Sequence, residues 1–133
     1  MDGEQATGLQ GLRVLVVEDI ALLAWRVRDV LAEAGAEVVG PAPDVPRALA
    51  LLEKHEVDAA VLDMNLNGET ADPIADALAT RDVPFLFLTG YGSGTAGGRH
   101  AERPILGKPL KAAALVRAVA GLGVGRRRVG GPG

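Results

Sequence analysis

Four short apolar runs in this chain each end in side chains that could take part in phosphate chemistry. The runs cover residues 12–17, 57–62, 84–88 and 104–107, and the residues that follow them are Glu18-Asp19, Asp63, Thr89-Gly90 and Lys108-Pro109. A carboxylate can attack a phosphoryl group as a nucleophile, and further carboxylates supply the oxygen ligands that Mg²⁺ prefers. A hydroxyl and an amine can bind the oxygens of the transferred group. These residue types predict a site that binds a divalent metal and handles a phosphoryl group.

The composition of the four runs indicates how these residues come together. Each run is rich in Val, Leu, Ile or Phe, which is typical of strands buried on both faces of a parallel sheet. In an open parallel sheet the carboxyl ends of the strands share one edge, and ligands bind in the crevice beside it. We therefore expect the acids, the threonine and the lysine to converge on one edge of one sheet.

Helical patterns alternate with the strands along the chain. Asp44 is expected to cap the second helix, and a loop over residues 64–68 is expected to lead into the third. The alternation predicts a right-handed doubly wound α/β fold of the flavodoxin-like type, with a five-stranded parallel sheet in the order 2-1-3-4-5. The expected helices cover residues 21–34, 45–55, 69–80 and 110–120, and the expected second strand covers residues 36–40.

Three sections of the chain differ in composition. Residues 12–121 carry the strand and helix patterns and form one predicted domain, whereas residues 1–11 are polar and are interpreted as a flexible leader. Residues 122–133 are rich in glycine and arginine and are expected to be a disordered basic tail. Five glycines fall within residues 90–100, where a fourth helix would belong, so we predict a weak or irregular helix there.

The overall composition limits the class of protein. The formal net charge is −3 although the basic cluster 126–128 contributes +3, so the other residues sum to −6 and do not favour nucleic-acid binding. The chain has no cysteine, which excludes disulfides and thiolate metal sites. It has no signal-peptide pattern at its start and no apolar run near the ~20 residues that span a bilayer. We expect a soluble, cytoplasmic protein that does not contact membranes.

The order of the motifs resembles the receiver domain of two-component response regulators, from about Leu12 to about Gly121. The acidic pair, Asp63, Thr89 and the Lys-Pro pair stand at receiver-like spacing, each at the end of a predicted strand. The resemblance implies that Asp63 accepts a phosphoryl group. The donor would be a sensor histidine kinase or a histidine phosphotransfer protein.

The metal ligands expected at such a site are hard oxygen atoms. Asp19 is expected to bind Mg²⁺ directly, with Glu18 binding directly or through water and Asp63 completing the carboxylate set. Resemblance to receivers adds the backbone carbonyl of Asn65 as a ligand.

The phosphoryl group itself is expected to meet a second set of residues. Lys108 would pair with the phosphoryl oxygens, and with Asp63 before phosphorylation, while Thr89 would donate a hydrogen bond to a phosphoryl oxygen. Gly90 leaves room for the phosphate to approach. The resemblance implies that the Lys108-Pro109 peptide bond is cis, which is a low-cost conformation only before proline.

Residues 84–92 are similar to a subgroup of stand-alone receivers marked by a Phe-Ala-Thr-Gly-Tyr-Gly stretch, with Leu88 in the place of the alanine. Typical receivers also carry an aromatic residue two positions before the lysine, where this chain has Leu106. Tyr91, two residues after Thr89, is the candidate for a substitute moving aromatic. Packing over the loop is an equally weighted alternative for Tyr91.

Trp25 is the only tryptophan in the chain. It lies about 200° from Leu23 at helical pitch, so it is expected to face solvent on the helix that begins beside the acidic pair. Receivers dock kinase or phosphotransfer helices on this helix, and exposed aromatic residues are favoured interface anchors. Trp25 is therefore a candidate partner contact, with packing against neighbouring side chains or a homodimer contact as the alternatives.

The leading hypothesis is a single-domain response regulator that acts by protein–protein contact or as a phosphate relay or sink. It would not be an enzyme beyond its own phosphorylation and dephosphorylation chemistry. The competing hypothesis is a receiver-like interaction module that works without phosphorylation. The complete acid set and Thr89 favour the first hypothesis, while Leu106 and the weak fourth helix leave the second open.

Overall fold

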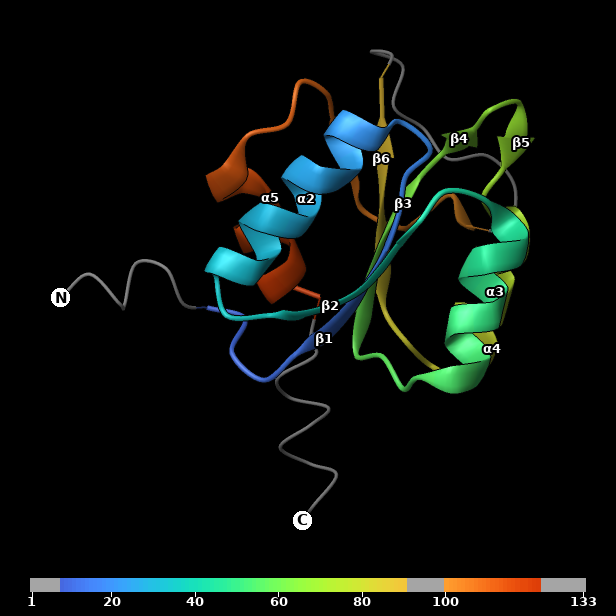
Figure 1. Ribbon diagram of the computed structural model, residues 1–133, viewed down its shortest axis with the longest axis horizontal. Coiled ribbons are helices and arrows are strands. Elements are labelled where there is room, and N and C mark those ends of the chain that lie inside the picture. Colours follow the sequence, from blue (N-terminus) through green and yellow to red (C-terminus); the bar gives the residue numbers. More distant parts are fainter. Residues whose placement is uncertain (1–7, 91–99, 123–133) are drawn as a thin grey trace, which may run out of the picture.

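A computed structural model of the chain describes residues 8–90 and 100–122. Within them, five parallel strands form one sheet in the order β2-β1-β3-β6-β7, which confirms the predicted strand order. Helices α2 and α5 cover one face of this sheet, and α3 and α4 cover the other (Figure 1). The sheet strands are β1 (Arg13–Val17), β2 (Glu37–Ala42), β3 (Ala59–Asp63), β6 (Phe85–Thr89) and β7 (Ile105–Gly107), and the helices are α2 (Ala21–Glu33), α3 (Val45–Lys54), α4 (Asp72–Thr80) and α5 (Ala112–Ala120).

Each face of the sheet has its own hydrophobic core. Strands β3 and β6 are buried along their whole length, because helices cover both faces. Side chains alternate between the faces, so Leu62 and Phe85 pack towards α3 and α4, while Val61 and Leu86 pack towards α2 and α5. Burying each large apolar side chain stabilises the fold by roughly 1.5–3 kcal/mol. The central strands are therefore firm supports for the residues at their ends.

The register of the strands brings their carboxyl ends to a common edge. Asp63 at the end of β3 lies beside Leu88 of β6, and Thr89 at the end of β6 lies beside Gly107 of β7. The acidic pair follows β1, which is the other neighbour of β3. The sheet therefore places the acids, the hydroxyl and Lys108 along one edge.

Strand β2 is longer than the predicted 36–40, because Ala42 still pairs with Val17 of β1. The carbonyl of Ala42 also accepts a hydrogen bond from the Glu18 backbone N–H at 3.0 Å. Strand β2 can follow this course because residue 40 is a glycine. Its φ is +101°, and a Cβ there would lie 2.9 Å from the Val16 carbonyl oxygen. Strand β2 thus reaches the acidic pair and holds its backbone.

The loop predicted over residues 64–68 and the helix predicted from residue 69 need correction. Strands β4 (Asn65–Leu66) and β5 (Glu69–Thr70) form an antiparallel hairpin, and α4 begins only at Asp72. Asn67 and Gly68 both have positive φ, as an Asn-Gly type I′ turn requires. Leu66 is 2% exposed and packs into the core, which anchors the hairpin beside Asp63.

The remaining helix boundaries follow local chemistry. The Asp44 carboxylate accepts a hydrogen bond from the Arg47 backbone N–H at 2.9 Å, so Asp44 caps α3 as predicted. Helix α5 starts at Ala112, two residues later than expected, because the chain remains extended at its N-cap residue Lys111.

The packed part of the chain starts before residue 12, the first residue of the predicted domain. Leu9 is fully buried, and the backbone N–H groups of Gly8 and Leu9 both donate to the Ala34 carbonyl. Residues 1–7 of the predicted leader, residues 91–99 of the predicted irregular helix and residues 123–133 of the predicted tail lie outside the described residues. None of the helices in residues 8–90 and 100–122 combines the length and hydropathy that a membrane span requires.

Candidate functional site

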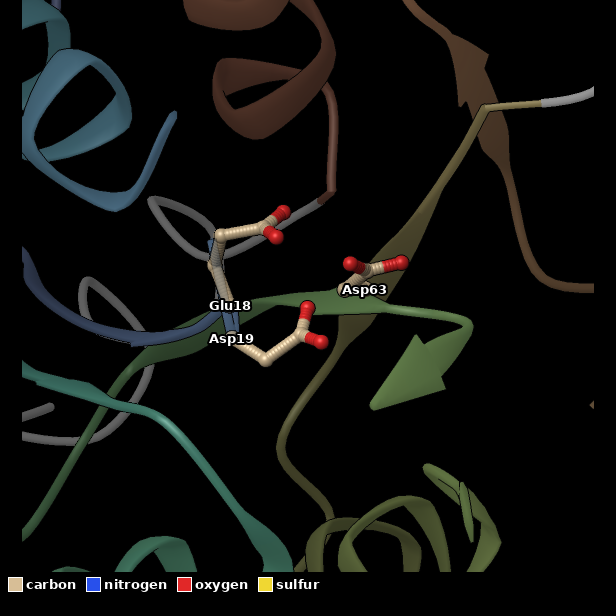
Figure 2. A group of neighbouring side chains, drawn as sticks. All are labelled: Glu18, Asp19 and Asp63. Carbon is tan, nitrogen blue, oxygen red and sulfur yellow. The ribbon is translucent and has the colours of Figure 1, made fainter. Parts of the chain in front are cut away.

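Three carboxylates meet at the carboxyl edge of the sheet. Each of Glu18, Asp19 and Asp63 offers an oxygen within 4.8 Å of the others, and Figure 2 shows the three side chains reaching into one common space. Glu18 is 2% exposed and Asp63 is 4% exposed, while Asp19 is half-buried. Two ligands on opposite sides of a Mg²⁺ ion lie about 4.2 Å apart, since each bond is about 2.1 Å. The three oxygens therefore fit around one ion after small side-chain adjustments.

Lys108 supplies positive charge to this cluster. Its Nζ lies 3.3 Å from Asp63 Oδ2 and 3.3 Å from Glu18 Oε2, so one ammonium group bridges two buried carboxylates. Its backbone N–H donates to the Thr89 carbonyl at 2.8 Å, which ties it to the end of β6. The peptide bond between Lys108 and Pro109 is cis. The sequence reasoning anticipated the contact with Asp63 but not the contact with Glu18.

Glu18 is the least satisfied group of the site. Within residues 8–90 and 100–122, its Oε2 has no hydrogen-bond partner, although Lys108 Nζ is near. Burial raises the pKa of Glu18 to about 7, and the hydrogen bond and charge of Asp63 act in the same direction. The Ile20 backbone N–H and Lys108 lower this pKa but do not offset the burial. A divalent cation would satisfy a buried carboxylate oxygen that accepts no hydrogen bond, so the residues present fit such an ion.

The raised pKa of Glu18 gives a testable dependence of stability on pH. Between about pH 4.5 and 7 the metal-free folded state holds a proton that the unfolded state releases, so stability falls as pH rises through this window. Glu18→Gln removes this titration. Relative to Glu18→Gln, the parent should lose on the order of 2 kcal/mol of unfolding free energy between pH 4.5 and 7.5. Urea unfolding in EDTA at several pH values measures the difference, and parallel pH curves for the two proteins would contradict it.

The backbone around Asp63 supports its carboxylate from one side. The Asn65 backbone N–H donates to Asp63 Oδ1 at 3.1 Å. The Asn65 side chain is turned away into the hairpin, where its Oδ1 accepts a hydrogen bond from the Gly68 N–H at 2.9 Å. Asn65 therefore contributes its backbone N–H to the site, and its role as a carbonyl ligand stays a prediction.

The residues expected to bind the phosphoryl group line the neighbouring strand ends. Thr89 is 9% exposed at the end of β6. Among residues 8–90 and 100–122, a Cβ at Gly90 would meet only the Lys108 side chain, at 3.9 Å, so these residues leave space beside Lys108 at this position. Tyr91, the candidate moving aromatic, lies outside the described residues. Leu106 is half-buried and packs against the core between the sheet and helices α2 and α5.

An exposed apolar surface adjoins the site on α2. Trp25 is 53% exposed, on the side its helical position predicts, and the Arg28 guanidinium lies 4.2 Å from its ring centroid. Ile20 is 54% exposed and Leu22 is 83% exposed, and the sequence reasoning missed both. Helical spacing could have identified Leu22, which falls off the buried face of this helix, but not Ile20, which precedes the buried Ala24 by four residues.

Comparison with known proteins agrees with this arrangement. The family model of the response regulator receiver domain matches residues 14–120. The transcriptional regulatory protein PdtaR of Mycobacterium tuberculosis is 32% identical over 80 residues, which make up 59% of this chain and 39% of PdtaR. The match thus spans well under half the length of that relative.

Solved structures with this fold include two of proteins named SdrG. The solution structure of SdrG from Sphingomonas melonis Fr1 is 39% identical, has a TM-score of 0.74, and covers 87% of this chain and 98% of SdrG. The solution structure of the BeF3-activated conformation of SdrG, from Pseudomonas melonis Fr1, is also 39% identical. It has a TM-score of 0.69 and covers 81% of this chain and 92% of that one. With the family model matched over most of its length, this chain belongs to the response regulator receiver domain family of two-component signalling.

Proposed function

We propose that this chain accepts a phosphoryl group on Asp63 in a Mg²⁺-dependent reaction and signals by contact with other proteins. The observation that carries the proposal is the surroundings of Asp63. Its buried carboxylate shares one space with two further carboxylates and lies 3.3 Å from Lys108 Nζ. Membership of the receiver family supports a histidine kinase or a histidine phosphotransfer protein as the donor.

The proposed reaction is a nucleophilic displacement at phosphorus. An Asp63 carboxylate oxygen attacks the phosphorus atom of a phosphohistidine, forming an O–P bond while the N–P bond breaks. The electron pair of that bond returns to the imidazole nitrogen, which then takes a proton from solvent. A bound Mg²⁺ ion would be held by Glu18, Asp19, Asp63 and the Asn65 carbonyl and would neutralise charge on the phosphoryl oxygens.

Lys108 and Thr89 complete the proposed site from the side of β6 and β7. Lys108 already neutralises Asp63 and is placed to transfer its charge to a phosphoryl oxygen on Asp63. The Thr89 hydroxyl would donate a hydrogen bond to another phosphoryl oxygen. Thr89 directly precedes the β6–β7 connection. Its hydrogen bond to the phosphoryl group would therefore couple the conformation of that connection to phosphorylation of Asp63.

The phosphodonor protein is proposed to dock on the apolar surface formed by Ile20, Leu22 and Trp25. This surface starts beside the acidic pair, since the Ile20 backbone N–H donates to Glu18 Oε1 at 3.1 Å. Clustered exposed apolar residues mark interaction sites. Trp25→Ala should slow transfer from a cognate kinase but leave labelling by acetyl phosphate unchanged. Equal slowing with both donors would place the role of Trp25 in the fold, and a concentration-dependent molecular mass would favour a homodimer contact.

The competing function is a receiver-like interaction module that acts without phosphorylation. Leu106 is the observation that favours it, because a half-buried leucine in the core cannot act as the moving aromatic of typical receivers. Incubation with acetyl phosphate in MgCl₂ or EDTA, followed by intact-mass measurement, separates the two functions. We expect one added phosphoryl group in MgCl₂ and none in EDTA. No labelling in either, together with no binding of beryllofluoride, would favour the competing function.

A further inference from the structure

A buried histidine lies at the opposite end of β6 from Thr89. His100 is 7% exposed, and its Nε2 lies 2.8 Å from Oδ1 of Asp76 on α4. A buried imidazole nitrogen needs a hydrogen-bond partner, and a bond to a carboxylate is stronger than one between neutral groups. The contact thus joins two parts of the chain that lie 24 residues apart in sequence.

Further contacts hold the turn formed by residues 100–104. The His100 ring packs edge-on against Phe85 at the start of β6, with 5.5 Å between ring centroids. The Arg103 guanidinium lies 4.3 Å from the centroid of the same ring, and the Arg103 backbone N–H donates to the His100 carbonyl. The Phe87 backbone N–H donates to the Pro104 carbonyl at 2.9 Å. The 100–104 turn is therefore attached to both α4 and β6.

This turn leads directly into the strand that carries Lys108. Strand β7 has three residues and pairs in the described sheet with β6 alone. Its register sets Thr89 beside Gly107, and the Lys108 backbone N–H bonds to the Thr89 carbonyl. The position of so short a strand depends on the contacts made at its two ends. The start of β7 is held by the 100–104 turn, and its end carries Lys108 into contact with Asp63.

We propose that His100 is a positioning residue for phosphoryl binding. Its contact with Asp76 ties the start of β7 to α4, and thereby sets where β7 presents Lys108 to Asp63. Without this contact β7 keeps its backbone hydrogen bonds to β6 but loses this attachment to α4. Lys108 would then be held less firmly over the phosphoryl oxygens. The inference rests on the proposed roles of Lys108 and Thr89 in phosphoryl binding.

The test separates phosphoryl binding from metal binding. The full chain, Asp76→Ala, His100→Phe and the double variant are titrated with Mg²⁺ alone, and then with beryllofluoride at saturating Mg²⁺. Each single variant should weaken beryllofluoride binding about three- to tenfold, and the double variant should be no weaker than the weaker single variant, because both substitutions remove the same contact between His100 and Asp76. The Mg²⁺ affinity should not fall, since the metal ligands lie just after β1, on β3 and in the hairpin, and a less firmly held Lys108 competes less with the ion for Glu18 and Asp63. His55→Phe, at the other histidine of the chain, which is exposed, is the matched control and should change neither affinity.

Three outcomes would overturn the inference. These are unchanged beryllofluoride affinity in Asp76→Ala, equal weakening of Mg²⁺ and beryllofluoride binding, and losses that add in the double variant. The Asp76 side chain is 44% exposed on a helix surface, so Asp76→Ala should fold even where His100→Phe does not, and it then decides alone. If the parent binds no beryllofluoride at saturating Mg²⁺, the proposed function itself fails and the inference fails with it.

Discussion

Asp63→Asn is expected to abolish labelling of the chain by acetyl phosphate. The asparagine side chain keeps the shape of aspartate but has no carboxylate to attack phosphorus, so the labelling rate should fall by on the order of a thousandfold or more. The fold should survive, because the substitution removes one of three crowded carboxylates and so relieves repulsion in the cluster. Intact-mass measurement in MgCl₂ gives the labelling rate, and urea unfolding gives the stability.

Asp82→Asn is the matched control for this substitution. Asp82 is exposed in the turn after α4 with φ at 63°, a conformation that asparagine also tolerates. It should be labelled at the parental rate. If Asp63→Asn is labelled as fast as this control, the acceptor is another residue and the proposed function must be abandoned.

Asp19→Asn is expected to weaken Mg²⁺ binding by at least about tenfold, which corresponds to about 1.4 kcal/mol. An amide oxygen carries no full charge, so the variant loses one of the three charged ligands that the site offers. Asp19 is half-buried and belongs to neither hydrophobic core, so the fold should change little. Trp25 lies on the helix that begins beside the site, and its fluorescence should report the titration.

Asp29→Asn provides the comparison for the metal titration. It lies on the same helix as Trp25 and pairs with Arg28, whose guanidinium covers the Trp25 ring, but it is remote from the acidic pair in sequence. This variant should bind Mg²⁺ with the parental affinity even if its fluorescence differs. A parental Mg²⁺ affinity in Asp19→Asn would mean that a different ligand set holds the metal.

The sheet and the composition of its edge follow from local sequence patterns. Runs such as 57–62 and 84–88 are apolar without alternation because helices cover both faces of their strands. In a parallel sheet, such strands necessarily direct their carboxyl ends to one edge, so the acids, Thr89 and Lys108 had to converge. The hairpin at residues 65–70 was missed, although Asn67-Gly68 is a recognised hairpin turn pair. Its two strands are so short that its place depends on the tertiary burial of Leu66.

Residue order alone determined the fold and the members of the candidate site, because apolar periodicity and strand-end position are local properties of a chain. Only the tertiary structure decided the environment of each member. Burial raises the pKa of Glu18 to about 7, and the bridge from Lys108 to Glu18 and the pairing of His100 with Asp76 depend on which distant elements pack together. Desolvation and charge pairing act through space, over distances that residue spacing along the chain does not encode.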